Sequence, residues 1–159
     1  MKDKVLIGGI LILLFLSVGL CSAANRVPNE DLIINHFYLG MDRNNVEKVI
    51  GNPVKEQKYG KYIEYVYERG QVKIIYHDNK VIRMKIKDRK WKNTRGLHCG
   101  DLEEKIKHNY GQPYLFSDHP VEKSYSYQNI NCDSKIEFIA IDGYVQEIIV
   151  QKDEYFRLG

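Results

Sequence analysis

The side chains best suited to chemistry in this 159-residue chain are its three cysteines and five histidines. Cys21 lies within an apolar N-terminal leader, which leaves Cys99 and Cys132 as the two cysteines of the remaining chain. Because the leader predicts an oxidising compartment, where two lone cysteines most simply pair, we expect a disulfide between Cys99 and Cys132. Such a bond would close a loop of about thirty residues and stabilise the fold by ~3 kcal/mol.

Catalysis and metal binding are the alternatives for the same region. Cys99 lies near His98 and His108 in the sequence, so it could act as a nucleophile beside a histidine, or the three side chains could hold a zinc ion. No histidine has the close spacing to a carboxylate of an H-E-x-x-H motif, and no Gly-rich phosphate loop, G-x-S-x-G motif or glycosidase-like carboxylate pair is present. The sequence therefore predicts a protein that is not an enzyme, with no catalytic residue, metal site or cofactor.

A charged head precedes the unbroken apolar run Val5–Leu20, so residues 1–24 have the layout of a signal peptide or lipoprotein leader. Cleavage after Ala23 or Ala24 would use the small residues that such sites require. Alternatively, Val18-Gly-Leu-Cys21 resembles a lipobox, in which Cys21 is lipidated and tethers the protein to a membrane. A third alternative is an uncleaved anchor, since about 20 apolar residues span a bilayer. All three place the remaining chain in the cell envelope, as a periplasmic or membrane-anchored protein, or secrete it.

The charge distribution gives little indication of an anionic partner. The formal net charge is only +3, so nucleic-acid binding is not expected. The most basic run, Lys85–Arg95, lies at the expected junction between two halves of the chain. Its Trp91 is a candidate anchor on an anionic membrane or a partner protein, although charge runs are also ordinary in solvated linkers.

The elements that must position these side chains follow an internal repeat. A helix start, an apolar residue and a Gly-x-Pro stop occur twice, sixty positions apart: Gly40, Val46, Gly51 and Pro53 correspond to Gly100, Ile106, Gly111 and Pro113. In the first copy, Asp42 is expected to cap a helix that ends at Gly51. In the second copy, Asp101 and Glu104 have the spacing of a capping box.

Three strand signals follow each predicted helix, separated by turns short enough for antiparallel hairpins. They are Tyr62–Tyr67, Val72–Tyr76 and Val81–Ile86, and then Ser124–Tyr127, Lys135–Ile141 and Tyr144–Val150. The stretches Val54–Lys61 and Tyr114–Val121 are expected to be loops. The predicted fold is therefore α+β: two tandem repeats of one helix and three antiparallel strands, over residues 25–90 and 91–159, that form one sheet with both helices on one face.

The sheet face without helices is the predicted binding surface. Alternation along the strands points a set of apolar and aromatic side chains away from the presumed core: Tyr62, Ile75, Ile139, Tyr144 and Ile149. An exposed apolar face of this kind is typical of a site that binds another protein. A register error of one residue would exchange the two faces.

The pattern Gly40-Met-Asp-x-x-x-Val46-x-x-x-Ile50-Gly-x-Pro53, followed by aromatic strands, resembles the SmpA/OmlA family of small bacterial envelope lipoproteins. The tandem layout also looks like the β-lactamase-inhibitor-protein fold, in which two repeats form a curved sheet that grips a protein. The first resemblance implies a non-catalytic envelope scaffold of the outer-membrane assembly type, which binds another protein. The second implies, as the alternative, a secreted inhibitor-like protein that binds an enzyme through its open sheet face.

Overall fold

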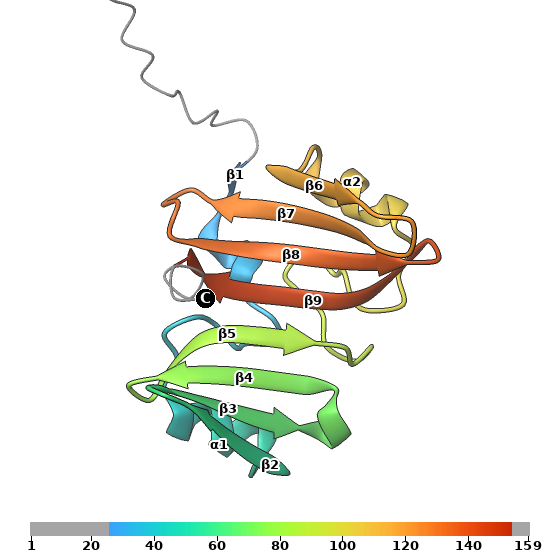
Figure 1. The fold of residues 1–159 in the computed structure, drawn as a ribbon. Coiled ribbons are helices and arrows are strands. Elements are labelled where there is room, and N and C mark those ends of the chain that lie inside the picture. Colours follow the sequence, from blue (N-terminus) through green and yellow to red (C-terminus); the bar gives the residue numbers. More distant parts are fainter. Residues whose placement is uncertain (1–25, 154–159) are drawn as a thin grey trace, which may run out of the picture.

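The computed structural model describes residues 26–153 and shows one broad twisted sheet with short helices behind it (Figure 1). The leader and its predicted cleavage or lipidation sites, including Cys21, lie outside the described residues. Within residues 26–153 no helix is long and apolar enough to cross a bilayer.

Each half of the chain contributes one α-helix followed by four strands. The first half has α1 (Arg43–Ile50), β2 (Lys55–Tyr59), β3 (Tyr62–Tyr67), β4 (Val72–His77) and β5 (Lys80–Ile86). The second half has α2 (Glu104–Tyr110), β6 (Leu115–Asp118), β7 (Lys123–Asn129), β8 (Ser134–Ile141) and β9 (Tyr144–Lys152). Three short elements complete the order: β1 (Arg26–Val27) and the 3-10 turns η2 (Asn29–Leu32) and η3 (Glu68–Gly70).

All these strands belong to one sheet, in the order β1-β7-β8-β9-β5-β4-β3-β2, with β6 also paired to β7. Strands β5 and β9 join the two halves through an antiparallel register that runs from Arg83↔Gln151 to Ile86↔Ile148. β1 pairs in parallel with β7, with Arg26 opposite Gln128. The sheet is therefore mixed, and its hydrogen bonding continues from one half into the other.

The predicted α+β fold of two helix-plus-three-strand repeats is wrong. Over residues 26–153 the structure is a sheet-dominated fold, with nine strands in one mixed sheet and two short α-helices. β2 and β6 lie within the stretches predicted as loops, and both are largely exposed edge strands. An edge strand that buries neither face has no need of alternating apolar residues, so pattern reading misses it.

The core lies between the sheet and the helices and loops that Figure 1 shows behind it. Val46 of α1 and Ile106 of α2, which correspond in the repeat, are fully buried there. Two other apolar residues at these helices, Val49 within α1 and Leu102 just before α2, are exposed. Each helix thus buries one apolar side chain fully, while Ile50 and Tyr110 pack against the core partly buried. Aromatic side chains of the strands fill much of the remaining core: Tyr65, Tyr67, Tyr76, Tyr125, Tyr127 and Phe138.

Neither helix start has the predicted hydrogen bonds. Asp42 holds the N-cap position of α1, but its carboxylate makes no capping bond and instead pairs with Lys80 Nζ at 2.9 Å. Asp101 lies before α2, where its Oδ2 accepts from the backbone N–H of His98 at 2.9 Å and from Lys105 Nζ at 2.8 Å. The acids expected as caps therefore bind side chains and loop backbone around the helix starts.

Trp91 is a core residue, which corrects its prediction as a surface anchor. Its side chain is only 4% exposed and stacks on Phe37, with ring centroids 4.9 Å apart. The loop that carries Trp91 is tied to the first residues of the described chain, because Asp31 Oδ2 pairs with Arg95 Nη2 at 2.6 Å. An indole packed in this way has no face left for a membrane or a partner.

Candidate functional site

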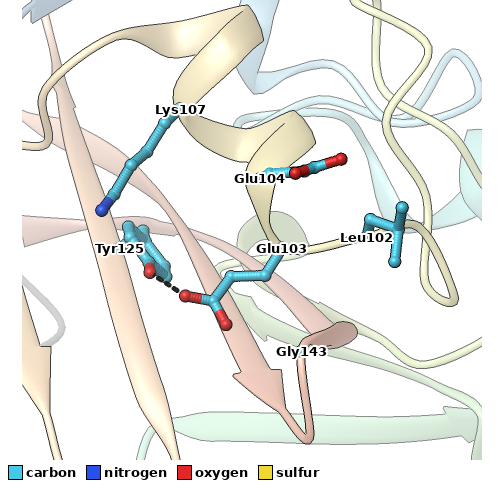
Figure 2. Close-up of a pocket in the computed structure, with 6 residues that line it drawn as sticks. All are labelled: Leu102, Glu103, Glu104, Lys107, Tyr125 and Gly143. Atoms are coloured by element: carbon cyan, nitrogen blue, oxygen red, sulfur yellow. Dashed lines mark hydrogen bonds between the residues drawn. The ribbon is translucent and has the colours of Figure 1, made fainter.

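A shallow hollow of about 380 Å³ opens between the start of α2 and the β8–β9 turn (Figure 2). The backbone N–H of Glu103 donates to the Gly143 carbonyl at 2.8 Å and so fixes the helix start to the turn. Asp142 and Gly143 form this turn with φ values of 52° and 78°, a left-handed pair that an Asp-Gly sequence favours. The hollow is lined by Leu102, Glu103, Glu104, Lys107, Tyr125 and Gly143.

The Glu103 carboxylate forms the base of the hollow and is fully engaged. It accepts a hydrogen bond from the Tyr125 hydroxyl, drawn as the dashed line in Figure 2, and pairs with Lys123 Nζ at 3.1 Å. Burial raises the pKa of Glu103, but the bonds from Tyr125 and Lys123 outweigh it and leave the pKa below its usual value. Burial, followed by the bond to Glu103, raises the pKa of Tyr125. Near neutral pH the pair is therefore a fixed carboxylate and a neutral donor, an arrangement suited to holding the hollow in shape.

Lys107 extends over the aromatic side of the hollow. Its Nζ lies 5.5 Å from the ring centroid of Tyr125 and 5.5 Å from that of Phe116, whose rings contact each other at 4.9 Å. A cation placed over ring faces is attracted by their negative quadrupole. Among residues 26–153 no carboxylate pairs with Lys107, so its exposed ammonium can meet an acidic group from outside.

Three exposed apolar side chains lie in or next to the hollow: Leu102, which lines it, Phe116 and Tyr144. We call them the apolar rim. They are 50%, 43% and 47% exposed, respectively. Leu102 and Tyr144 are held together by a backbone bridge, and Phe116 packs on Tyr125, its neighbour on the adjacent strand. Tyr144 is one of the predicted partner-binding residues, and the structure places it beside Leu102.

The corresponding positions of the first half carry charges. Leu102 and Phe116 correspond to Asp42 and Glu56, sixty positions earlier, and Tyr144 corresponds to Lys80, sixty-four positions earlier. The structure supports this alignment, because Asp42 and Lys80 are joined by the same kind of isolated backbone bridge as Leu102 and Tyr144. In the first half the ion pair Asp42–Lys80 occupies this position, whereas in the second half the exposed apolar side chains of Leu102 and Tyr144 do.

The inner pair is exchanged in sign between the halves. Glu103 and Lys107 correspond to Arg43 and Glu47. Arg43 Nη1 donates to the Tyr65 hydroxyl at 3.1 Å, and its Nε lies 3.7 Å from Glu47 Oε1. In the first half the helix therefore neutralises its own charge, whereas in the second half Glu103 turns to Lys123 and leaves Lys107 without an ion pair within the described residues.

The face predicted to be apolar and exposed is charged. Strand register places Tyr62, Ile75, Ile139 and Ile149 on the side away from the core, but Ile75 and Ile149 are only 5% and 7% exposed. Long charged side chains lie around them and pair across the strands, as Lys85 does with Glu147 at 2.8 Å. The predicted surface therefore offers mainly ion pairs to a partner: Lys73–Glu64, Lys85–Glu147, Lys87–Glu147 and Lys135–Glu137.

Cys99 is a free thiol, so the predicted disulfide to Cys132 is not formed. Its Sγ lies in the core and donates to the Ile86 carbonyl at 3.3 Å, while Cys132 lies in the turn between β7 and β8. Burial raises the pKa of Cys99 to about 12, which keeps it protonated and unsuited to act as a nucleophile or metal ligand. His98 Nδ1 donates to the backbone carbonyl of Cys99 at 2.9 Å, and residues 26–153 contain no cluster of three metal-binding side chains.

Comparison with known proteins relates the fold to secreted bacterial proteins. The sequence matches no protein-family model and no curated protein. A cysteine-rich secretory protein (SAV1118) from Staphylococcus aureus is similar with a TM-score of 0.61 and 10% identity, over 82% of this chain and 48% of that one. An extracellular protein with an SCP domain from Bacillus anthracis gives a TM-score of 0.54 and 11% identity, over 99% of this chain and 51% of that one.

These similarities concern the fold, because both identities are very low. The chain spans about half the length of the two similar structures. A DUF4309 family protein (YjgB) from Bacillus subtilis, at a TM-score of 0.45 and 15% identity over 81% of this chain and 88% of that one, is too distant to bear on it. None of the three is described as an SmpA/OmlA or β-lactamase-inhibitor protein, and the first two are described as secreted or extracellular, which agrees with the predicted export.

Proposed function

We propose that this is an exported, non-catalytic protein that binds another protein through the apolar rim around the α2 hollow. The observation that carries the proposal is the contrast between the halves. Leu102, Phe116 and Tyr144 are exposed where the same fold, sixty or sixty-four residues earlier, carries charged side chains. Large apolar side chains gathered at one exposed place mark an interaction site, because their burial against a partner is favourable.

The chemistry of the hollow favours a protein partner. Aromatic and aliphatic rim residues suit the centre of a protein interface, and Lys107 supplies a charge at its border. The paired Glu103 and Tyr125 hold the surface in one shape before a partner arrives, which lowers the cost of binding. The open face of the sheet exposes mainly charged side chains and little apolar surface. The inhibitor-like alternative, in which that face binds an enzyme, therefore receives no support of its own.

Site-specific photocrosslinking tests the proposal with controls that the fold itself provides. p-Benzoylphenylalanine replaces Leu102 or Tyr144 in the full chain, expressed in its native cell, and the same residue replaces Asp42 or Lys80 as the matched control. We expect an adduct to one and the same protein at positions 102 and 144 but not at 42 and 80. No adduct, or equal adducts at all four positions, would refute the proposal.

The finer location follows from the mass of the mature protein. We propose that the protein is located in the cell envelope, either anchored to a membrane or released. An anchored protein would act as an envelope scaffold, whereas a released protein would bind an enzyme. A diacyl or triacyl increment on Cys21 would establish a membrane-tethered lipoprotein and favour a scaffold partner in the membrane. An N-terminus at Ala24 or Asn25 would establish a soluble protein and favour a secreted enzyme as partner.

A further inference from the structure

Strand β6 is an edge of the sheet whose single charged residue, Asp118, lies at its end. All four of its residues are exposed, and it pairs with β7 on one side. The opposite edge, β2, carries Lys55, Glu56 and Lys58 among its five residues, and charged side chains on an edge discourage the addition of a further strand. β6 carries one charge, Asp118, and the apolar Leu115 and Phe116, so of the two sheet edges within residues 26–153 it is the one better suited to accept another strand.

We infer that β6 binds an extended segment of the partner protein as an added strand, a conclusion that rests on the proposed function and specifies how it operates. Backbone hydrogen bonds to an open edge supply affinity, and alternate side chains supply specificity. On the helix side of the sheet, Phe116 lies opposite Tyr125, under Lys107. The added strand would place a side chain beside Phe116 on this same face, at the edge of the hollow.

The side chains around Phe116 define the chemistry of this segment. The residue that faces Phe116 should be aromatic or aliphatic, because it extends the stack formed by Phe116 and Tyr125. A carboxylate two residues away lies on the same face and can pair with Lys107. It belongs on the Tyr114 side, since Asp118 would repel it at the other end of β6. The expected ligand is therefore an extended, acidic and apolar peptide segment.

A second copy of this chain fits the edge less well. Four residues of strand span roughly 14 Å, and a contact along so short an edge buries too little surface to reach the ~800 Å² that each partner buries in a stable dimer. An antiparallel pair of β6 strands centred on Phe116 would also bring two Lys107 side chains over one pair of rings, where their charges repel. A single extended segment meets neither difficulty.

Panning a phage-displayed library of random decapeptides on the mature protein tests the inference. We expect enriched peptides with an aromatic or aliphatic residue two positions from Asp or Glu, and binding roughly tenfold weaker to Phe116→Glu. With Lys107→Glu, which installs the residue of the first half, the selected acid should change to Lys or Arg. Glu56→Lys on the opposite edge is the matched control and should bind like wild type.

N-methylation of the selected peptide distinguishes an added strand from other binding modes. Methylating one alternating set of its amides should abolish binding, while methylating the other set leaves it intact, because only alternate N–H groups face β6. Equal effects of both sets would overturn strand addition while leaving a rim-mediated function intact. The absence of both enriched peptides and crosslinks at positions 102 and 144 would overturn both. A wild-type dimer in sedimentation velocity that Phe116→Glu dissociates would replace the partner segment by a second copy.

Discussion

Replacing Glu103 by glutamine tests whether its partly buried carboxylate holds the hollow in shape. The substitution keeps the side-chain shape but removes the charge that accepts from Tyr125 and Lys123. A hydrogen bond to a charged group contributes about 1.5–3 kcal/mol to stability, and the neutral amide can still accept from Tyr125. The exposed Lys123 partner is screened by solvent. We therefore expect Glu103→Gln to lower the free energy of unfolding by ~1–2 kcal/mol at neutral pH.

This loss should depend on pH in a defined direction. The bonds from Tyr125 and Lys123 lower the pKa of Glu103 in the folded state in spite of its burial. The carboxylate therefore stabilises the fold fully above its unfolded-state pKa of about 4.3, and this stabilisation is lost as the pH falls through the lower folded-state pKa. The difference in unfolding free energy between wild type and Glu103→Gln should be constant around neutral pH and shrink below about pH 4.

Urea unfolding followed by tryptophan fluorescence measures this difference. Trp91 is the single tryptophan and stacks on Phe37 in the core, so its emission reports on the folded state. Glu104→Gln is the matched control, because this neighbouring carboxylate is exposed and its loss should change stability by less than about 0.5 kcal/mol. Equal stability of wild type and Glu103→Gln at neutral pH, or a difference that grows in acid, would refute the reasoning.

Three further predictions follow from the same contacts. Ile106→Ala should lower the free energy of unfolding by ~2–5 kcal/mol, because the side chain is fully buried; thermal unfolding at the wild-type temperature would contradict the assigned core. In a Cys132→Ser background, Cys99 should react with a disulfide reagent only as fast as the protein opens, since it is buried and its pKa is about 12; rapid labelling of the native protein would show that the thiol is accessible. Leu102→Asp combined with Tyr144→Lys should install the ion pair of the first half and change stability by less than about 1 kcal/mol. The same double substitution should abolish photocrosslinking of the partner by p-benzoylphenylalanine at position 116; crosslinks that persist would show that Leu102 and Tyr144 do not contribute to binding.

The internal strands could be predicted because burial on one face imposes alternation on them. β3 occupies Tyr62–Tyr67 as predicted, and β9 begins at the predicted Tyr144. β2 and β6 were not predicted, because edge strands carry no such constraint. β1 was not predicted either, because it is held by pairing with β7, a contact across about a hundred residues that no local pattern indicates. The pairing of β5 with β9 is equally non-local, so no local pattern shows which strands join the two halves of the sheet.

The candidate site was predictable in part. Alternation placed Ile75 and Ile149 away from the core, but their exposure depends on neighbours from other strands. The aliphatic stems of long charged side chains cover apolar surface while their charged ends stay in water, and only the strand order shows which of them do so here. The apolar rim had a readable signal: at the spacing of the repeat, Leu102 replaces Asp42 and Phe116 replaces Glu56. Where two repeats share a fold but differ in the polarity of an exposed position, that position is a candidate for a function that only one repeat has.

The pairing of β5 with β9 also determines the order in which the fold can be completed. A chain that leaves the ribosome or crosses a membrane N-terminus first presents β1 before its partner β7 exists, and β5 before its partner β9. The hairpins β2–β5 can form early, yet they keep an open edge along Arg83–Ile86 until the last described strand arrives. A chain truncated before Tyr144 would retain that edge permanently and should aggregate through it. Strand β9 is therefore the closing element of assembly, and the interval before its arrival is when this protein most needs protection from other chains.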